Sequence, residues 1–309
     1  MDVKERVISE FLKTHNIDIS EAFIEDLDGV YWLINIQSAI DEELKIRANR
    51  LLEEKEPTWA ITRSMLDRVY ELIVEGFISL FTGAWASVEI VCRASLEASI
   101  NVLYVLDTDT INRLSQYVSH YFEEASKSIG RYESLITATA GGDKADLSSA
   151  IDARNMLAWR REIIEAIFQN DGIPFGVQGW PKQIIERFKA VGLELEYREI
   201  YASLSSQVHN DADALIDFMI VKALEAHAPE ASEKVGSEVF FWLRHFLYRC
   251  LKFYSDAAKL YATKYSLSEA MTNIEKERLL LSVRLRHLNN EYLRLRNAPN
   301  NNALNPTAR

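Results

Sequence analysis

The sequence predicts an all-α protein, a multi-helix bundle with a long amphipathic helix near its C-terminal end. Apolar residues recur at spacings of three and four along most of the 309 residues, which is the pattern of amphipathic helices. Only 11 glycines and six prolines are present, and no run rich in Val, Ile and Thr alternates with polar residues. We therefore expect helices throughout and no β-sheet.

The first half of the chain divides into helices at recognisable end signals. Val3 and Phe11 lie on one side of a short first helix. Pro57 ends the second helix, because its ring excludes a continuing helical backbone. Gly83 suits the left-handed residue that closes a helix, and Asp109 is a good N-cap. The predicted helices span residues 2–14, 20–55, 58–81, 84–106 and 110–138.

Glycine and proline also separate the helices of the second half. We expect a flexible loop at 137–146 and an irregular connection at 170–182, which holds three of the 11 glycines. Pro181 is expected in the first turn of a short helix that ends before Gly192. The remaining predicted helices span residues 147–170, 195–226, 231–265 and 267–297.

The last helix differs in character from the others. Ser266 and Glu269 have the spacing of a capping box at its start. Six basic residues follow between 276 and 296, but glutamates dilute their charge, so we interpret this face as solvated. The helix also carries an apolar stripe formed by Ile274, Leu281, Leu285, Leu288, Tyr292 and Leu295, and we expect a homo-oligomer through this helix.

No shift in composition marks a domain boundary, so we expect one large domain rather than two. The predicted parts are an N-terminal helical region (1–57), a helical core domain that carries the polar site (58–266), the C-terminal helix (267–297) and a tail (298–309). The tail has no apolar periodicity and is expected to be disordered.

Composition excludes several classes of protein. The net charge is −11, which argues against wholesale binding to nucleic acid or to an anionic membrane. Two cysteines, Cys92 and Cys250, are too few for a disulfide framework or a Cys-rich zinc site. The longest uncharged run of the most apolar region, 77–88, is too short to span a bilayer. We expect a cytoplasmic protein with no membrane partner.

A first polar stripe lies on the apolar helix 84–106. Glu89, Arg93, Glu97 and Asn101 follow one another at intervals of four, so they share one slowly drifting face. Because a buried charge is costly unless it is paired, we expect an Arg93–Glu97 pair within or beside the core.

A second polar stripe lies in residues 197–215, where Tyr201, Ser205, His209 and Asp213 are also four apart. Asp213 lies one turn beyond His209, so its carboxylate can orient the imidazole and raise its pKa. A Ser/His/Asp triad is rejected, because one straight helix offers neither a sharp nucleophile turn nor oxyanion donors.

Neither a metal nor a cofactor is expected. The sequence contains no Glu-x-x-His, no His-Glu-x-x-His and no cysteine pair at ligand spacing. No glycine-rich phosphate loop follows a strand, so a nucleotide-binding loop of that kind is not expected either.

Two motifs resemble an uncharacterised bacterial family, domain of unknown function 5677, over about residues 60–225. The first is Arg93-x-x-x-Glu97-x-x-x-Asn101-x-x-Tyr104, and the second runs from Trp180 through Tyr201 and Ser205 to His209. The resemblance implies an all-helical domain in which Arg93, Glu97, Ser205 and His209 gather at one site. It implies no established reaction.

The tail NNNALNPTAR resembles the read-through translation that ends many proteins encoded in integron gene cassettes. That resemblance implies a mobile accessory gene, among which phage-defence functions are frequent. We therefore expect an accessory interaction or sensing module that takes RNA or a small ligand at the polar site.

The alternative is a metal-independent ribonuclease-like effector. Arg93 would clamp a phosphate, and His209 would act as general acid or base, oriented by Glu97 or Asp213. Ser205 and Tyr201 would position the substrate. Asn101 and Tyr104 are further predicted binding residues.

Overall fold

The computed structural model describes residues 2–53, 56–139, 144–202, 204 and 229–297. Within these ranges the chain forms helices, turns and irregular connections, and no strand. The predicted all-α class is confirmed. None of the described helices combines the length and the apolar character that crossing a bilayer requires.

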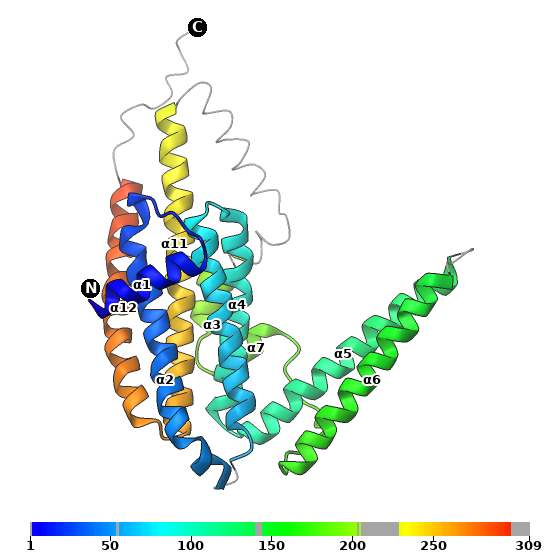
Figure 1. Ribbon diagram of the computed structural model, residues 1–309. Coiled ribbons are helices and arrows are strands. Elements are labelled where there is room, and N and C mark those ends of the chain that lie inside the picture. Colours follow the sequence, from blue (N-terminus) through cyan, green and yellow to red (C-terminus); the bar gives the residue numbers. More distant parts are fainter. Residues whose placement is uncertain (1, 54–55, 140–143, 203, 205–228, 298–309) are drawn as a thin grey trace.

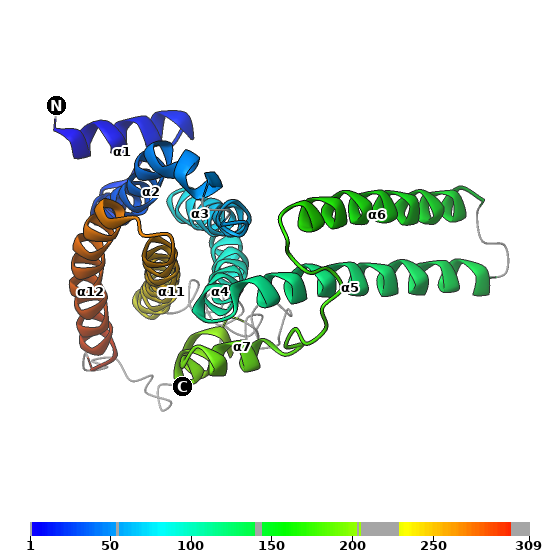
Figure 2. The same ribbon diagram turned by 90° about the horizontal axis from the view of Figure 1, so that it is seen from below.

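Five long helices form the bundle. Seen end-on in Figure 2, α11 lies inside an arc made by α12, α2, α3 and α4, and contacts among the helices agree with that arrangement. Buried residues of all five belong to one hydrophobic cluster. The helices are α2 (Leu27–Glu53), α3 (Trp59–Phe81), α4 (Trp85–Asp107), α11 (Pro229–Lys264) and α12 (Ser268–Asn297).

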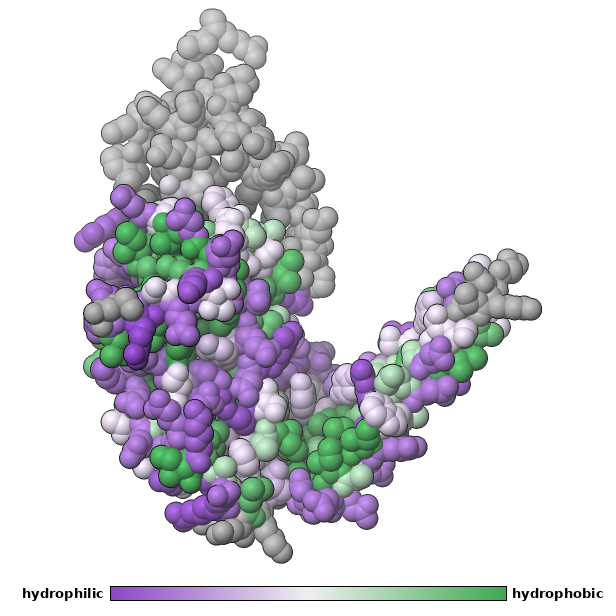
Figure 3. Space-filling model, viewed as in Figure 1, coloured by the Kyte–Doolittle hydropathy of each residue, from purple (hydrophilic) through white to green (hydrophobic). Residues whose placement is uncertain are grey.

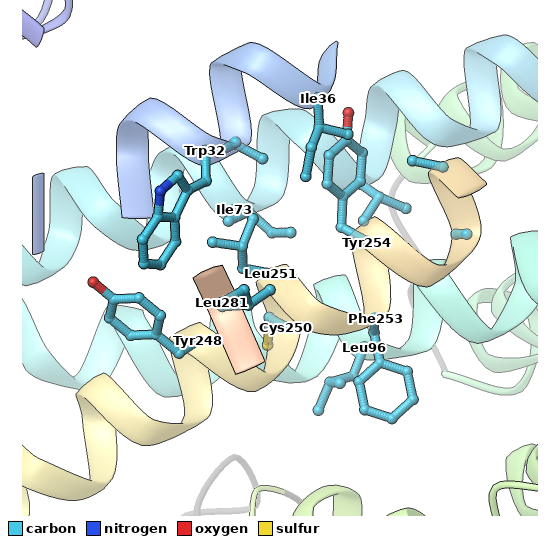
Figure 4. Close-up of a cluster of buried hydrophobic side chains, with 14 of the residues drawn as sticks. Trp32, Ile36, Ile73, Leu96, Tyr248, Cys250, Leu251, Phe253, Tyr254 and Leu281 are labelled. Carbon is cyan, nitrogen blue, oxygen red and sulfur yellow. The ribbon is translucent and has the colours of Figure 1, made fainter. Parts of the chain in front are cut away.

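Aromatic residues of α11 fill the centre of the bundle. Tyr248, Phe253 and Tyr254 are almost completely buried, and Figure 4 shows them among side chains of α2, α3 and α4. The Tyr254 hydroxyl donates to Oε1 of Gln37 at 2.6 Å, so this buried polar atom is satisfied. At Gly76 a Cβ would lie 2.7 Å from a methyl group of Leu247, so glycine permits the close approach of α3 and α11.

Most predicted helix ends are confirmed. Gly83, at φ +75°, follows α3, and the Asp109 carboxylate accepts the backbone N–H of Asn112 at the start of α5 (Thr110–Ala138). The first helix, α1 (Val3–Thr14), also agrees with its prediction. The range 20–55 is different, because a 3₁₀ helix (η1, Glu21–Asp26) precedes α2.

The connection 171–183 is irregular, as expected, and three of its glycines have positive φ. The placement of Pro181 is wrong. The short helix α7 (Ile184–Ala190) begins three residues later, with Gln183 as its N-cap. Trp180 and Pro181 therefore belong to the irregular segment, which brings Trp180 into a second buried cluster.

The predicted capping box of the last helix is also wrong. Ser266 adopts a left-handed conformation, at φ +57°, and lies outside α12. Glu43 of α2 fills the role instead, since its Oε2 accepts the backbone N–H groups of Glu269 (2.9 Å) and Ala270 (2.8 Å). A carboxylate suits this position, because the unpaired N–H groups and the positive end of the helix dipole both lie at the start of a helix.

We expect the variant Glu43→Ala to lower the free energy of unfolding by about 1–2 kcal/mol, because it leaves two N–H groups at the start of α12, of which that of Ala270 is buried, without their acceptor. Urea titration measures the loss. The neighbouring Glu42 is exposed and serves as the control, with an expected change of less than about 0.5 kcal/mol for Glu42→Ala. Equal losses in both variants would contradict the capping role.

The apolar stripe of α12 is used within the chain. Ile274, Leu281, Leu285 and Leu288 are buried, and α12 packs on α2 and α11. These four residues are therefore not available to a second copy, whereas Tyr292 of the same stripe is half-buried. The homo-oligomer through this helix stays a prediction, as does the division of the chain into parts.

Two helices leave the bundle as an antiparallel arm. α5 and α6 (Lys144–Asn170) pack against each other and project away from α4 (Figures 1 and 2). Near its base the arm joins the second buried cluster through Leu114 and Phe168, which pack with Trp180. This departure from the bundle encloses a hollow between α4, α7 and the arm.

Candidate functional site

The structure describes five of the eight residues that the sequence assigns to the site. Arg93, Glu97, Asn101 and Tyr104 lie on α4, and Tyr201 lies across from them. The other three predicted site residues, Ser205, His209 and Asp213, lie outside the described residues.

Tyr201 meets α4 from a π-helical turn, η2 (Tyr197–Tyr201), which follows the short α8 (Glu194–Glu196). Its hydroxyl donates to Oε2 of Glu97 at 3.3 Å, and its ring lies 5.5 Å from the Arg93 guanidinium carbon. The ring of Tyr197 stacks on that of Tyr201 at 5.4 Å. The two predicted motifs therefore meet at Glu97 and Tyr201.

Arg187 of α7 is the cation at the centre of the site. Nη1 donates a hydrogen bond to Oδ1 of Asn101, and Nη2 lies 3.7 Å from Oε1 of Glu97. Its guanidinium carbon is 5.2 Å from the Trp180 ring. The sequence predicts Arg93 as the ion-pair partner of Glu97; in the structure Arg187 pairs with that carboxylate.

One side of the site is buried, and the other side is exposed to solvent. The Arg187 side chain is only 7% exposed, whereas that of Glu97 is 43% exposed. Burial lowers the pKa of Arg187 and raises those of Tyr201 and Tyr117. A guanidinium remains charged in proteins, so Arg187 is a cation held in a largely desolvated place.

A cavity of about 750 Å³ opens beside Arg187. Eight of its 14 lining residues are aromatic or aliphatic, and the other six are polar or charged. The lining comes from α4 (Glu97, Asn101), α5 (Tyr117, Val118, His120, Tyr121, Phe122), α6 (Trp159, Arg160, Ile163, Ile164), the segment that leads into α7 (Trp180, Lys182) and α7 itself (Arg187).

The charge of the lining is mainly positive. Arg160, Lys182 and Arg187 face a single carboxylate, that of Glu97. Nε of Arg187 is buried and has no hydrogen-bond partner within the described part of the chain. A buried donor without an acceptor is costly, so this end of the cavity suits an anionic group.

Tyr104 has a supporting position. It is buried, its ring packs edge-on against Trp180 at 5.2 Å, and Arg113 lies 4.1 Å above it. It does not line the cavity, but it holds Trp180, which does. No group of three metal-ligating side chains occurs in the described ranges.

The sequence reasoning missed Arg187, although a signal was present. Ile184, Phe188 and Val191 are spaced by four and three, and Arg187 occupies a position of the same apolar face. An arginine on such a face needs an ion-pair or hydrogen-bond partner, because a buried charge is costly without one. The exposed Trp159 of α6 was missed for another reason, since only the fold shows that α6 borders the site.

Comparison with protein families gives one match. The sequence profile of a family of unknown function (DUF5677) matches residues 60–225, slightly more than half of the chain. All the residues that line the cavity lie within this range. Comparison with curated proteins and with solved structures gave no match.

Proposed function

The chain belongs to the family of unknown function DUF5677, and from the geometry of its site we propose that it is a sensing module that binds a small ligand in the cavity between α4, α5, α6 and α7. The observation that carries the proposal is the combination of a largely apolar wall and the desolvated cation Arg187 in the same lining. The volume, about 750 Å³, falls in the range of small-molecule sites.

The lining indicates the chemistry of the ligand. Trp159 and Trp180 offer flat apolar surfaces, and Arg187 offers a guanidinium to an anionic group. The ligand is therefore a planar, largely apolar molecule that carries a negative charge. Such a module would suit the mobile accessory gene that the resemblance of the C-terminal tail implies, and phage-defence functions are frequent among such genes.

The dye anilinonaphthalene sulfonate has this chemistry and can report binding by its fluorescence. We expect the variant Trp159→Ala to weaken dye binding about tenfold, because an aromatic contact contributes about 1–1.5 kcal/mol. The Trp159 side chain is 56% exposed, so its removal should leave the fold intact.

Trp85 provides the matched control, because it is also exposed and does not line the cavity. Trp85→Ala should bind the dye as the wild type does. Identical affinity in all three proteins would contradict the proposal, since the dye would then bind elsewhere or not specifically.

The second candidate remains the metal-independent ribonuclease. The observation that favours it is the three cationic side chains of the cavity, which could hold RNA phosphates despite the acidic chain. Its general acid or base would be His209. RNA cleavage by the purified protein should then be lost in His209→Ala; equal cleavage by both, or none by either, removes this candidate.

A further inference from the structure

The arm carries an unusual share of the exposed apolar surface. α5 and α6 hold 56 of the 309 residues. They carry ten of the 22 large hydrophobic side chains that are exposed among the described residues. Figure 3 shows apolar surface along the arm, most densely near its base. A pair of helices gains little stability alone and needs a further packing partner for its apolar faces.

Seven of these side chains share one side of the arm. At the base, Tyr121 of α5 and Trp159 and Ile163 of α6 line the same cavity, so both helices turn these positions to one side. Helical spacing continues the two stripes toward the tip. We call this surface the arm face: Tyr121, Tyr132 and Leu135 of α5, and Met156, Trp159, Ile163 and Ile167 of α6.

The area of the arm face is close to what a dimer needs. Its side chains are 39–67% exposed. At roughly 150–250 Å² for a side chain of this size, they present about 700 Å². One partner's share of a standard interface is about 800 Å².

Charge favours a second copy as the partner. The helices α5 and α6 together contain seven basic and seven acidic residues, so the arm helices carry no net charge although the chain carries −11. Two arms therefore meet with little repulsion, whereas two bundles would repel each other. Two helical hairpins that join apolar faces make a four-helix bundle, and a two-fold axis gives both copies the same environment.

We propose that the arm is a dimerisation element and that two copies of the chain join their arm faces antiparallel into a four-helix bundle. The tip of one arm, at Leu135, then lies over the base of the other, at Trp159 and Ile163. Because these two base residues also line the cavity, the partner arm covers the cavity mouth. Dimerisation and ligand access are thereby linked.

The test is the molar mass in solution, measured by light scattering after size-exclusion chromatography. The wild type should have twice the chain mass of 35.4 kDa. The double variant Tyr132→Glu/Leu135→Glu should have the single-chain mass with unchanged helicity, because both side chains are exposed. Leu279→Glu/Val283→Glu places charges on exposed positions of α12 and should remain dimeric.

Crosslinking adds a readout that does not depend on destabilising the arm. Ser128 is exposed on the same side of α5 as Tyr121 and Tyr132 and lies between them, near the expected two-fold axis of the dimer. Ser126 is also exposed, but it points about 200° away from Ser128 around the helix axis. Cys92 and Cys250 are buried, so an introduced cysteine is the accessible one. Ser128→Cys should oxidise to a covalent dimer and Ser126→Cys should not.

A monomeric wild type, a dimer that only the α12 variant dissociates, or equal crosslinking at both serines would each overturn the proposal. The dye experiment shows separately whether the proposed function fails. The monomeric arm variant keeps every residue of the cavity and should still bind the dye if the proposed function is right.

Discussion

The variant Asp26→Ala is expected to lose about 3 kcal/mol of stability. Asp26 is completely buried where η1 meets α11 and α12. Its carboxylate accepts a hydrogen bond from Nε of Arg244 at 3.0 Å, and Nη2 of Arg284 lies 3.6 Å away. Removing the carboxylate leaves two largely buried guanidinium groups without the buried carboxylate that they share, which is the costly way to break a buried ion pair.

The adjacent Glu25 is the natural control. It contacts the same two arginines, at 3.9 and 2.7 Å, but its side chain is 68% exposed. Because water can replace an exposed carboxylate, Glu25→Ala should cost less than about 1 kcal/mol. Chemical denaturation gives both values, and similar losses would refute the distinction. A single transition that shifts as a whole would also show that η1 unfolds together with the bundle.

The variant Arg187→Met is expected to lose recognition of the anionic group of the ligand and to keep recognition of its apolar part. Methionine keeps apolar volume in the cavity wall but removes the cation, whose interaction with an anion contributes about 1.5–3 kcal/mol. Binding of anilinonaphthalene sulfonate should therefore fall about 10- to 100-fold. Binding of the uncharged parent compound, phenylnaphthylamine, should persist.

The two dyes make the result informative about mechanism. If Arg187→Met weakened both dyes equally, Arg187 would serve the shape of the cavity and not the charge of the ligand. Lys189→Met is the matched control, because Lys189 is an exposed cation on the same short helix and does not line the cavity. The Lys189→Met variant should bind both dyes with the affinity of the wild type.

The sequence predicts the helices well because their ends depend on neighbouring residues. Gly83 closes α3, and Asp109 caps α5 through the N–H group three residues ahead. The apolar spacing that defines each helix is equally local. The motif on α4 likewise places Glu97 and Asn101 on one face, and both line the cavity.

Interactions between distant segments could not be predicted in this way. The carboxylate that caps α12 comes from Glu43, more than 220 residues earlier in the chain, so no local sequence pattern predicts it. Arg187 meets Asn101 only because α7 folds back onto α4. The same limit applies to the arm, since amphipathic spacing alone does not tell whether an apolar face meets the bundle or leaves it.

A crystal structure of the protein with anilinonaphthalene sulfonate tests the central claim most directly. We expect the naphthalene ring against Trp180 and Trp159, with the sulfonate within hydrogen-bond distance of the Arg187 guanidinium. Dye bound only on the outer surface, with Arg187 still enclosed by Asn101 and Glu97, would contradict the assignment of this cavity as a ligand site.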